Sequence, residues 1–427
     1  MERFEVIIIG AGLAGLAAAY TLAGEGIEVV VLERGEFPGA KNVSGGRLYL
    51  NPVRPLFPSL WEDAPFERKI VHEGITLLAK EGSVALEYSG EELRRPPGHS
   101  FSVLRSRFDR WLAERAEERG AAILPNTLVE KPLVEQGRVI GVRAGGEDLA
   151  ADVVISCDGA LSLTAEKAGL RTPGFPRDYA VGVKEVIALD PGKIADRFHV
   201  SEGEGSARLY LGDVTKGMFG GGFLYTNRDS ISIGLVIRIE DIGGEAARSV
   251  PALLDAFKER PEICSLVRGG TTAEYSAHLI PEAALRGMGK LYGDGIIIAG
   301  DAAGLALNLG LTVRGMEYAL ASGYYAAQAF LRAKEKRDFS APSLEVYRSL
   351  LDDSFVLKDF RNFAATPDVL DNPRYFEHYP ELAAAVFRDL YKVPAGSKDT
   401  LFSTVRRHVD LKEIWSILKD LKKASAI

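Results

Sequence analysis

The first 33 residues constrain the fold of this chain more than any other stretch. Residues 4–9 are a run rich in β-branched side chains, and it leads into the glycine pattern of residues 10–15. An alanine-rich segment follows to about Gly24, and a second apolar run over residues 27–32 ends at Glu33. A strand, a glycine turn, a helix and a second strand in this order predict a Rossmann-like α/β fold that binds a dinucleotide.

Each part of the glycine turn has its own role in such a fold. Gly10 permits a tight turn, Gly12 lets a pyrophosphate approach the backbone, and Gly15 lets helix and strand pack closely. The helix that starts at Leu13 and Ala14 supplies amides to the phosphates. The carboxylate of Glu33, followed by Arg34, lies where an acid accepts ribose hydroxyls and repels a 2'-phosphate. A purely structural turn is the minor alternative, because strand, helix and acid are all in place.

Two later segments favour a flavin dinucleotide over a nicotinamide one. Residues 102–112 read as the start of a helix from which Arg105 can reach an anionic cofactor, with a solvated helix face as the alternative. A hairpin-like pair, residues 138–142 and 148–150, precedes an apolar strand over residues 152–157 that ends in Asp158 and Gly159. This strand returns the chain to the nucleotide sheet.

A third apolar run, residues 296–299, ends in Gly300-Asp301 and then in small residues. This pattern predicts a buried strand that delivers a carboxylate to the start of a helix. Asp301 can then hold ribityl hydroxyls, and the helix amides can face the phosphates or the pyrimidine end of a flavin. Taken alone, an ordinary turn with an N-cap explains the same two residues equally well.

Together these segments resemble the glutathione-reductase-like flavoprotein superfamily, in the branch of aromatic hydroxylases, geranylgeranyl reductases and electron-transfer flavoprotein:quinone oxidoreductases. The resemblance spans nearly the whole chain. The first two groups usually place a proline shortly after the Gly-Asp-Ala-Ala segment, and this chain has none there. Within the branch, the chain looks like the FixC family in residues 41–48, 181–186, 274–281 and 308–316.

The resemblance to the FixC family implies FAD as the cofactor. It also implies electron flow from the subunits of an electron-transfer flavoprotein, through FAD, towards a membrane quinone, in a multi-subunit complex that is a candidate for electron bifurcation. A prenyl reductase of the geranylgeranyl type is one alternative, and a docking subunit with a structural flavin is another. The glycines of residues 220–222 lack a following helix, so no NAD(P)H domain is expected.

The candidate site residues follow from the motifs and the resemblance. The residues expected to bind the cofactor are Gly10, Gly12, Leu13, Ala14, Gly15, Glu33, Arg34, Lys41, Ser44, Gly45, Gly46, Arg105, Asp158, Gly159, Gly300, Asp301, Gly304, Asn308 and Gly310. Gly45 and Gly46 let backbone approach one face of the flavin ring, with Asn308 and Arg314 near its other end. His278 and Tyr275 are candidate proton donors for quinone reduction. A salt bridge for Arg314 and a structural role for His278 remain open.

The chain contains only two cysteines, Cys157 and Cys264. The longer single-chain quinone oxidoreductases carry four cysteines that bind an iron–sulfur cluster, and two isolated thiols cannot supply four ligands. No metal site is therefore expected, and the resemblance implies a separate ferredoxin-like iron–sulfur subunit, as FixX is beside FixC. Buried structural roles are expected for both thiols, with a redox disulfide as the minor alternative.

Composition and charge limit the partners and the cellular location that we expect for this protein. The net charge of −7 argues against a nucleic-acid partner, and no stretch approaches twenty consecutive apolar residues. We therefore expect a cytoplasmic protein, peripheral on the inner face of the cell membrane, where a quinone is reached. Two glutamines beside a charged fraction of 26% are typical of heat-adapted proteins, although genome composition produces the same bias.

Three regions are expected. Residues 1–75, 100–175 and 290–335 form the interleaved FAD-binding domain, and residues 76–99 and 176–289 form a mostly antiparallel β-sheet domain for the quinone or other substrate. Residues 336–427 form a mostly helical region for docking to a partner or to the membrane. Within its last part, Leu411, Ile414, Trp415, Leu418 and Leu421 share one helical face flanked by lysines. A membrane-surface helix and a helix packed on protein both fit this pattern.

Overall fold

The computed structural model describes residues 1–41, 46–243 and 249–425. Its first sheet has the strand order β16 (Tyr292–Gly293), β17 (Ile296–Ile298), β10 (Glu147–Ser156), β1 (Glu2–Ile9), β2 (Val29–Leu32) and β7 (Ala122–Leu124). β1 runs parallel to both β2 and β10, and β10 runs parallel to β17. β9 (Arg138–Ala144) pairs with the start of β10 and with β8 (Val129–Glu135) as an antiparallel extension. The Rossmann-like prediction is confirmed.

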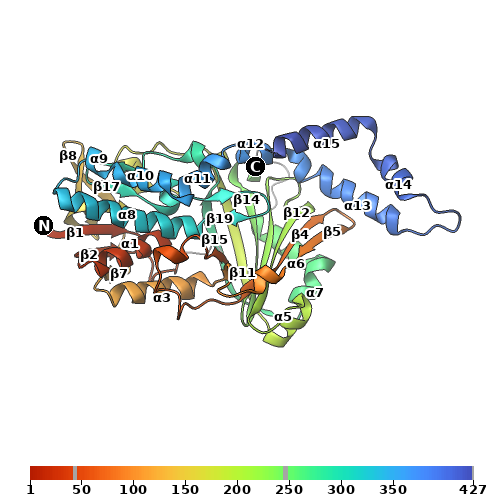
Figure 1. The fold of residues 1–427 in the computed structure, drawn as a ribbon, viewed down its shortest axis with the longest axis horizontal. Coiled ribbons are helices and arrows are strands. Elements are labelled where there is room, and N and C mark those ends of the chain that lie inside the picture. Colours follow the sequence, from red (N-terminus) through yellow and green to blue (C-terminus); the bar gives the residue numbers. More distant parts are fainter. Residues whose placement is uncertain (42–45, 244–248, 426–427) are drawn as a thin grey trace.

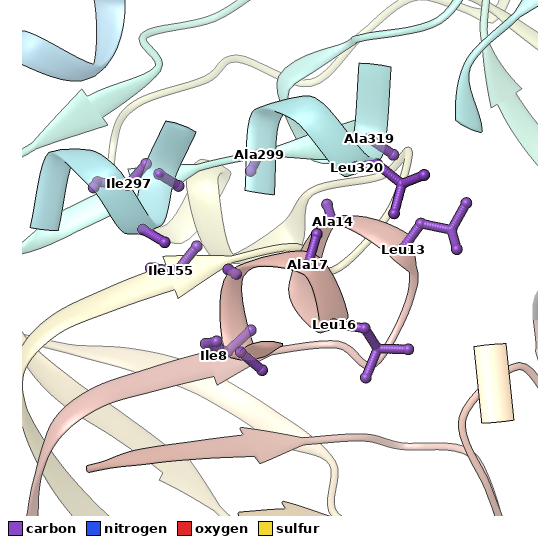
Figure 2. Packing of buried hydrophobic residues seen from close by; sticks show 14 of the residues in the cluster. Ile8, Leu13, Ala14, Leu16, Ala17, Ile155, Ile297, Ala299, Ala319 and Leu320 are labelled. Carbon is purple, nitrogen blue, oxygen red and sulfur yellow. The ribbon is translucent and has the colours of Figure 1, made fainter. Parts of the chain in front are cut away.

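Two helices pack against each other over this sheet. α1 (Leu13–Gly24) directly follows the glycine turn, and α8 (Met316–Lys336) follows the segment after Asp301. Figure 2 shows Ala14 and Ala17 of α1 facing Ala319 and Leu320 of α8, above the strand residues Ile8 and Ile155. Small residues allow α1 and α8 to pack this closely, because a Cβ on Gly323 of α8 would overlap the backbone of Ala14. α3 (Arg105–Glu117) packs on the other side of α1.

The second sheet is mostly antiparallel. Its strand order is β15 (Thr271–Pro281), β11 (Tyr179–Ala188), β14 (Ser230–Arg238), β13 (Gly220–Thr226), β12 (Glu204–Gly212), β4 (Lys69–Leu78), β6 (Ser100–Ser102) and β3 (Arg47–Tyr49), with β5 (Ser83–Tyr88) beside β4. One face packs a separate apolar core against α5 (Pro191–Phe198), α6 (Val250–Glu259) and α7 (Pro261–Val267). The other face is directed towards the nucleotide-binding half, as Figure 1 shows.

The sheet pairing differs from the expected domain boundaries in one respect. Residues 47–49, 69–75 and 100–102 were assigned from the sequence to the FAD-binding domain, but β3, β4 and β6 belong to the second sheet. The cause is a long-range pairing, in which β4 lies parallel to β12 in a register that places Leu77 opposite Leu211. A partner more than a hundred residues away cannot be read from the local pattern of these short strands.

The chain is mostly helical from Met316 to Ala424, as was expected for the region that starts at residue 336. α9 (Ala341–Leu344), α10 (Val346–Asp353), α11 (Phe355–Asn362) and α12 (Thr366–Leu370) follow α8. α13 (His378–Tyr391), α14 (Leu401–His408) and α15 (Leu411–Ala424) then form an arm that projects from the end of the molecule opposite the N terminus (Figure 1). We call α13 to α15 the C-terminal arm.

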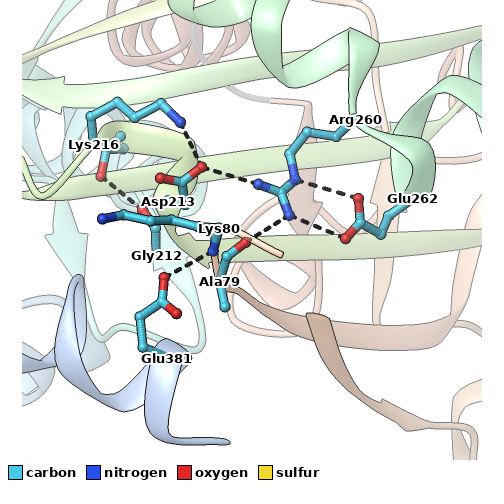
Figure 3. A network of polar contacts seen from close by, with 9 residues as sticks. Ala79, Lys80, Gly212, Asp213, Lys216, Arg260, Glu262 and Glu381 are labelled. Carbon is cyan, nitrogen blue, oxygen red and sulfur yellow. Dashed lines mark hydrogen bonds and ion pairs between the residues drawn. The ribbon is translucent and has the colours of Figure 1, made fainter. Parts of the chain in front are cut away.

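Polar contacts attach the arm to the second sheet at the turn between β4 and β5. The backbone N–H of Lys80 donates to Oε1 of Glu381 on α13 at 2.8 Å. On the other side of the turn, Arg260 donates to the carbonyl of Ala79 at 2.9 Å and to Asp213 at 3.1 Å. Figure 3 shows these contacts as one network, so a single turn joins α13 to the helices behind the sheet.

Candidate functional site

A cavity of about 500 Å³ lies where the nucleotide-binding half meets β15 of the second sheet. Many of the predicted cofactor-binding residues line it. These are Gly10, Gly12, Leu13, Ala14, Glu33, Arg34, Lys41, Arg105, Asp158, Gly159, Gly300 and Asp301. At least five separate chain segments, between Gly10 and Asp301, therefore contribute to one site.

The glycine turn has the geometry expected of a phosphate site. Gly10 has a φ of +94°, and a Cβ there would lie 2.5 Å from the carbonyl oxygen of Cys157. Gly12 is the N-cap of α1, and no side chain caps the helix. The first amides of α1 are therefore left for an anion, and the helix dipole favours negative charge at the same point.

The carboxylate of Glu33 is held in place by two backbone amides. Its Oε2 accepts from the amide of Ala11 at 2.8 Å, and its Oε1 accepts from the amide of Gly35 at 2.6 Å. The side chain is buried, and each oxygen keeps a further lone pair for a hydroxyl donor. This arrangement suits the hydroxyls of a ribose.

Asp158 lies at the carboxyl end of β10 and fixes the start of the next helix. Its Oδ1 accepts from Ser156 Oγ at 2.7 Å, and its Oδ2 accepts from the amide of Thr164 at 2.9 Å. The following Gly159 has a φ of +85°. These contacts give the pair a positioning role at the edge of the cavity.

Asp301 follows β17 and lines the cavity, but it lies in a four-residue 3-10 turn, Gly300–Ala303, rather than at the start of the helix that the sequence predicted. Burial raises the pKa of its carboxyl to about 6, although the charge of Arg105 acts in the opposite direction. A carboxyl that is partly withdrawn from water gains from hydroxyl donors, because its charge is poorly solvated without them. The amide of neighbouring Gly300 donates to Ser322 Oγ at 2.9 Å, which ties the turn to α8.

The predicted cations have different surroundings. Arg34 and Lys41 line the cavity. Arg105 also lines it, but its guanidinium donates to both oxygens of Asp109 at 2.7 and 2.8 Å. Burial opposes its charge, yet the Asp109 carboxylate outweighs burial and raises the pKa of Arg105. Arg105 is thus a fixed positive charge beside the cavity rather than a mobile side chain.

Several predicted residues lie elsewhere. Ser44 and Gly45 are outside the described residues. Gly15, Gly46, Gly304, Asn308 and Gly310 are absent from the described lining of the cavity. A Cβ on Gly46 would meet the ring of Tyr225 at 2.6 Å, and Asn308 accepts from the amide of Gly310 at 3.0 Å. In the described structure these residues therefore shape turns and packing around the site.

Arg314 follows the alternative that the sequence left open. It lines the cavity, but it donates to Glu317 at 2.6 Å and to Asp359 at 2.6 Å. Burial opposes its charge, and the Glu317 carboxylate is the main group that raises its pKa. The Asp359 pair ties the segment before α8 to α11, and the Glu317 pair holds Arg314 against the first turn of α8.

His278 lines the cavity, and Tyr275 is absent from its described lining. Both are on β15, where their sequence separation of three places them on opposite faces of the sheet. Tyr275 is 49% exposed. Burial and the charges of Arg105 and Arg34 lower the pKa of His278 to about 4. His278 is therefore neutral at pH 7.

Sequence reasoning missed part of the lining. Residues 127–130, between β7 and β8, line the cavity together with Leu161 and Leu163. Leu128, in the loop before β8, and Leu163, the first residue of a short helix, are both more than half exposed. Arg47 was also missed, and it is buried, paired with Glu73 and bonded to Ser100 Oγ at 2.9 Å. The sequence offered one signal for these segments, which is leucine in the stretches that follow two strands of the nucleotide sheet.

The two cysteines are not joined to each other. Cys157 follows β10 and packs against the core of the nucleotide-binding half, where burial raises the pKa of its thiol. Cys264 lies in α7, behind the second sheet. The redox-disulfide alternative is not the arrangement in this structure.

The site fits FAD by its own chemistry. Uncapped helix amides suit a pyrophosphate, the anchored Glu33 suits a ribose, and Asp301 suits the ribityl hydroxyls. A family model described as an FAD binding domain matches residues 3–200. The chain is therefore an FAD-dependent oxidoreductase, with FAD as its cofactor.

Relatives that match along the whole chain show which family of FAD-dependent oxidoreductases it belongs to. Protein FixC of Escherichia coli strain K12 is 43% identical over 426 residues, which cover 100% of this chain and 99% of that protein. A relative from the same strain, named as a probable electron transfer flavoprotein-quinone oxidoreductase, YdiS, is 42% identical over 427 residues, with the same coverage. The chain belongs to the FixC family, as the four sequence segments predicted.

Solved structures agree on the fold. A geranylgeranyl bacteriochlorophyll reductase-like protein from Thermoplasma acidophilum matches with a TM-score of 0.73 over 99% of this chain and 100% of that chain. Its sequence identity of 20% is low, so the likeness concerns the fold alone. It extends through the nucleotide-binding half and the second sheet.

Proposed function

We propose that this oxidoreductase accepts electrons from an electron-transfer flavoprotein and delivers them to a membrane quinone. The observation that carries the proposal is the lining of the cavity, which includes both the glycine turn before α1 and His278 and Ile280 of β15. A substrate resting on the second sheet would then lie in the same cavity as the cofactor, at the interface between two layers. The name of the relative YdiS supports the same pair of electron partners.

FAD, when bound, supplies the capacity to take up and release electrons one or two at a time. The chain's own residues bind it, exclude water and set the local charge. Arg105 places a fixed positive charge beside Asp301, and His278 contributes a neutral imidazole to the wall of the cavity. Because quinone reduction consumes two protons and neutral imidazole is a poor acid, His278 is better suited to hydrogen bonding than to proton delivery.

The C-terminal arm is proposed as the surface that reaches the membrane. On α15, Asp420 is buried and accepts from Arg374 at 3.1 Å and from Tyr379, so the side of the helix that carries Glu413 and Asp420 faces the protein, while its lysines are exposed. The apolar side is turned outward, with Leu411 78% exposed and Trp415 74% exposed. Lysines beside an exposed tryptophan suit the interface of an anionic membrane.

In the part of the chain that the structure describes, every helix is too short or too polar to cross a bilayer. We propose peripheral attachment to the inner face of the cell membrane through the arm. A separate ferredoxin-like iron–sulfur subunit completes the proposed complex. Whether that complex bifurcates electrons depends on the partner flavoprotein rather than on the residues of this chain.

The donor side of the proposal is tested by anaerobic reduction of the purified holoprotein. We expect NADH or NADPH alone to bleach the bound FAD negligibly on the timescale of turnover, and the reduced partner flavoprotein to bleach it rapidly. Rapid bleaching by NADPH alone would favour a reductase of the prenyl or hydroxylase type. Failure of both donors to bleach the FAD would favour a docking subunit with a structural flavin.

A further inference from the structure

A second polar side chain, Lys184, lies on the same face of the second sheet as His278, outside the described lining of the cavity. Lys184 lies in the middle of β11, directly opposite Ser276 of β15, while Gly182 lies opposite His278. Residues that pair across antiparallel strands share a face, and so do residues two apart along a strand. Lys184 and His278 therefore belong to the face that looks towards the nucleotide-binding half. The next residue, Glu185, is on the other face with Lys258 of α6.

Lys184 is buried with few partners. Its side chain is 4% exposed, and its single ion pair among the described residues is to Oε1 of Glu274 at 3.8 Å. Within the same residues its ammonium makes no hydrogen bond, although it carries three N–H donors. Burying such a group costs free energy unless a partner compensates it. An oxygen acceptor from outside the chain would supply that partner.

The surroundings of Lys184 fit a group that exchanges a proton. Burial and the positive charge of Arg105, on α3, lower the pKa of Lys184, and the Glu274 carboxylate acts against them. Glu274 and neutral His278 are the titratable groups that share this face of β15. Glu274 is 39% exposed and accepts from Ser276 Oγ at 3.4 Å, so it joins the buried ammonium to solvent.

We propose that the Lys184 ammonium donates a hydrogen bond to one carbonyl oxygen of the quinone and passes it a proton, which Glu274 then replaces from solvent. This inference rests on the proposed quinone reductase function. Two electrons from the donor flavoprotein, relayed by the reduced protein, convert both carbonyl groups to hydroxyl groups. One ammonium N–H bond breaks as one quinol O–H bond forms, and the second proton comes from water.

The direct test compares Lys184→Met, which keeps the length of the side chain without its charge, with Lys258→Met as the control. Lys258 pairs with Glu185 on the far face of the same strand. The probe is a redox-inert hydroxyquinoline N-oxide, a quinone analogue whose fluorescence is quenched on binding, titrated into oxidised holoprotein. We expect Lys184→Met to weaken binding by about tenfold or more, the scale of a lost charged hydrogen bond, and Lys258→Met to bind as the wild type does.

A kinetic arm separates proton delivery from electron transfer. Reduced Lys184→Met should be reoxidised slowly by a soluble quinone but at the wild-type rate by ferricyanide, which takes electrons and no protons. Glu274→Gln should keep the affinity for the analogue and slow only the reaction with quinone. If Lys184→Met loses FAD, Glu274→Gln becomes the variant that tests the proposal. The role of Lys184 would be overturned if Lys184→Met bound the analogue and reduced the quinone as the wild type does. If Lys184→Met could not be measured because it lost FAD, a wild-type quinone rate in Glu274→Gln would overturn that role. A wild-type protein that reduces ferricyanide and no quinone would instead overturn the proposed function.

Discussion

The nucleotide-binding half and the C-terminal arm use apolar side chains in opposite ways. In α1, every residue from Leu13 to Ala23 is buried between the sheet and α8. In α15, Asp420 is the buried residue, whereas the leucines and Trp415 are exposed. The first helix contributes to a core that the chain completes by itself. The second presents a surface that gains from covering by something else.

The difference also separates two kinds of function. The nucleotide-binding half places fixed charges and backbone amides around a cavity, so changes there should alter cofactor binding. The arm is joined to the rest of the chain by surface contacts, such as that between Lys80 and Glu381. Changes on its outer face should alter contacts with lipid or partners and leave the cofactor in place.

The largest expected effect comes from Gly12→Val. The φ of Gly12 is −85°, which any residue adopts, so the chain should fold with normal stability. The added side chain would occupy the space that the pyrophosphate needs, and purified protein should lose its yellow colour. Gly396→Val, at a glycine with open space around it, is the control and should keep about one FAD per chain. Normal FAD content in Gly12→Val would refute the assignment of this turn.

Asp301→Ala should have the next largest effect. Loss of a charged acceptor from a partly buried site weakens binding by about 1.5–3 kcal/mol, or roughly 10- to 100-fold in the dissociation constant of FAD. The constant can be measured by fluorescence as FAD is added to apoprotein. If affinity were unchanged, the carboxylate would have no role in holding the ribityl chain.

Changes on the arm should leave FAD binding intact. The triple variant Leu411→Gln, Trp415→Gln and Leu418→Gln alters side chains that are each more than half exposed, so folding should be unaffected. Truncation of the chain before Asp410 removes the whole of α15 and therefore the same apolar side chains. Both should lower binding to anionic liposomes by about tenfold, and high salt should mimic part of the loss.

Val134→Gln, at an exposed position on β8 in the nucleotide-binding half, is the matched control for the arm and should bind liposomes normally. Equal liposome binding by the triple variant, the truncated chain and the wild type would assign α15 to docking of a partner subunit. The membrane contact would then have to be sought around Met218, Phe219 and Phe223.

The smallest expected effect is a pH dependence that belongs to the cavity. His278 has a pKa near 4 in the folded chain against an ordinary value of 6.5, so the unfolded chain binds a proton first on acidification. Stability that is present at pH 7 should therefore be lost as the pH falls from 6.5 towards 4, by about 1–3 kcal/mol. Urea unfolding of apoprotein should show a smaller loss in His278→Gln. His199→Asn, at an exposed residue, should match the wild type.

Local motifs were the predictable part of this molecule. The glycine turn, Glu33 and Asp301 each lie within a few residues of the strand that positions them, so their convergence follows from the parallel order of β1, β2, β10 and β17. The helical phase of α15 was equally local, but its outward apolar face depends on Asp420 meeting Arg374 across the arm.

The second sheet was harder to predict because its chemistry depends on register. The alternation of side chains along a strand places His278 and Tyr275 on opposite faces of β15. Only the pairing of β15 with β11 brings Lys184 beside His278. In the same way, Arg314 satisfies its charge with Asp359, forty-five residues away, and no local signal marks that contact. Long-range pairs of this kind decide which polar residues remain available to a substrate.

The central claim is that electrons leave this protein on a membrane quinone, and single-turnover reoxidation tests it most directly. Anaerobically reduced holoprotein would be mixed with liposomes that contain a long-tailed quinone, and the absorbance of bound FAD would be followed while quinol is quantified. We predict complete reoxidation with one quinol formed per FAD. Bound FAD that stays reduced in the presence of the quinone, yet is reoxidised at once by ferricyanide, would contradict the account.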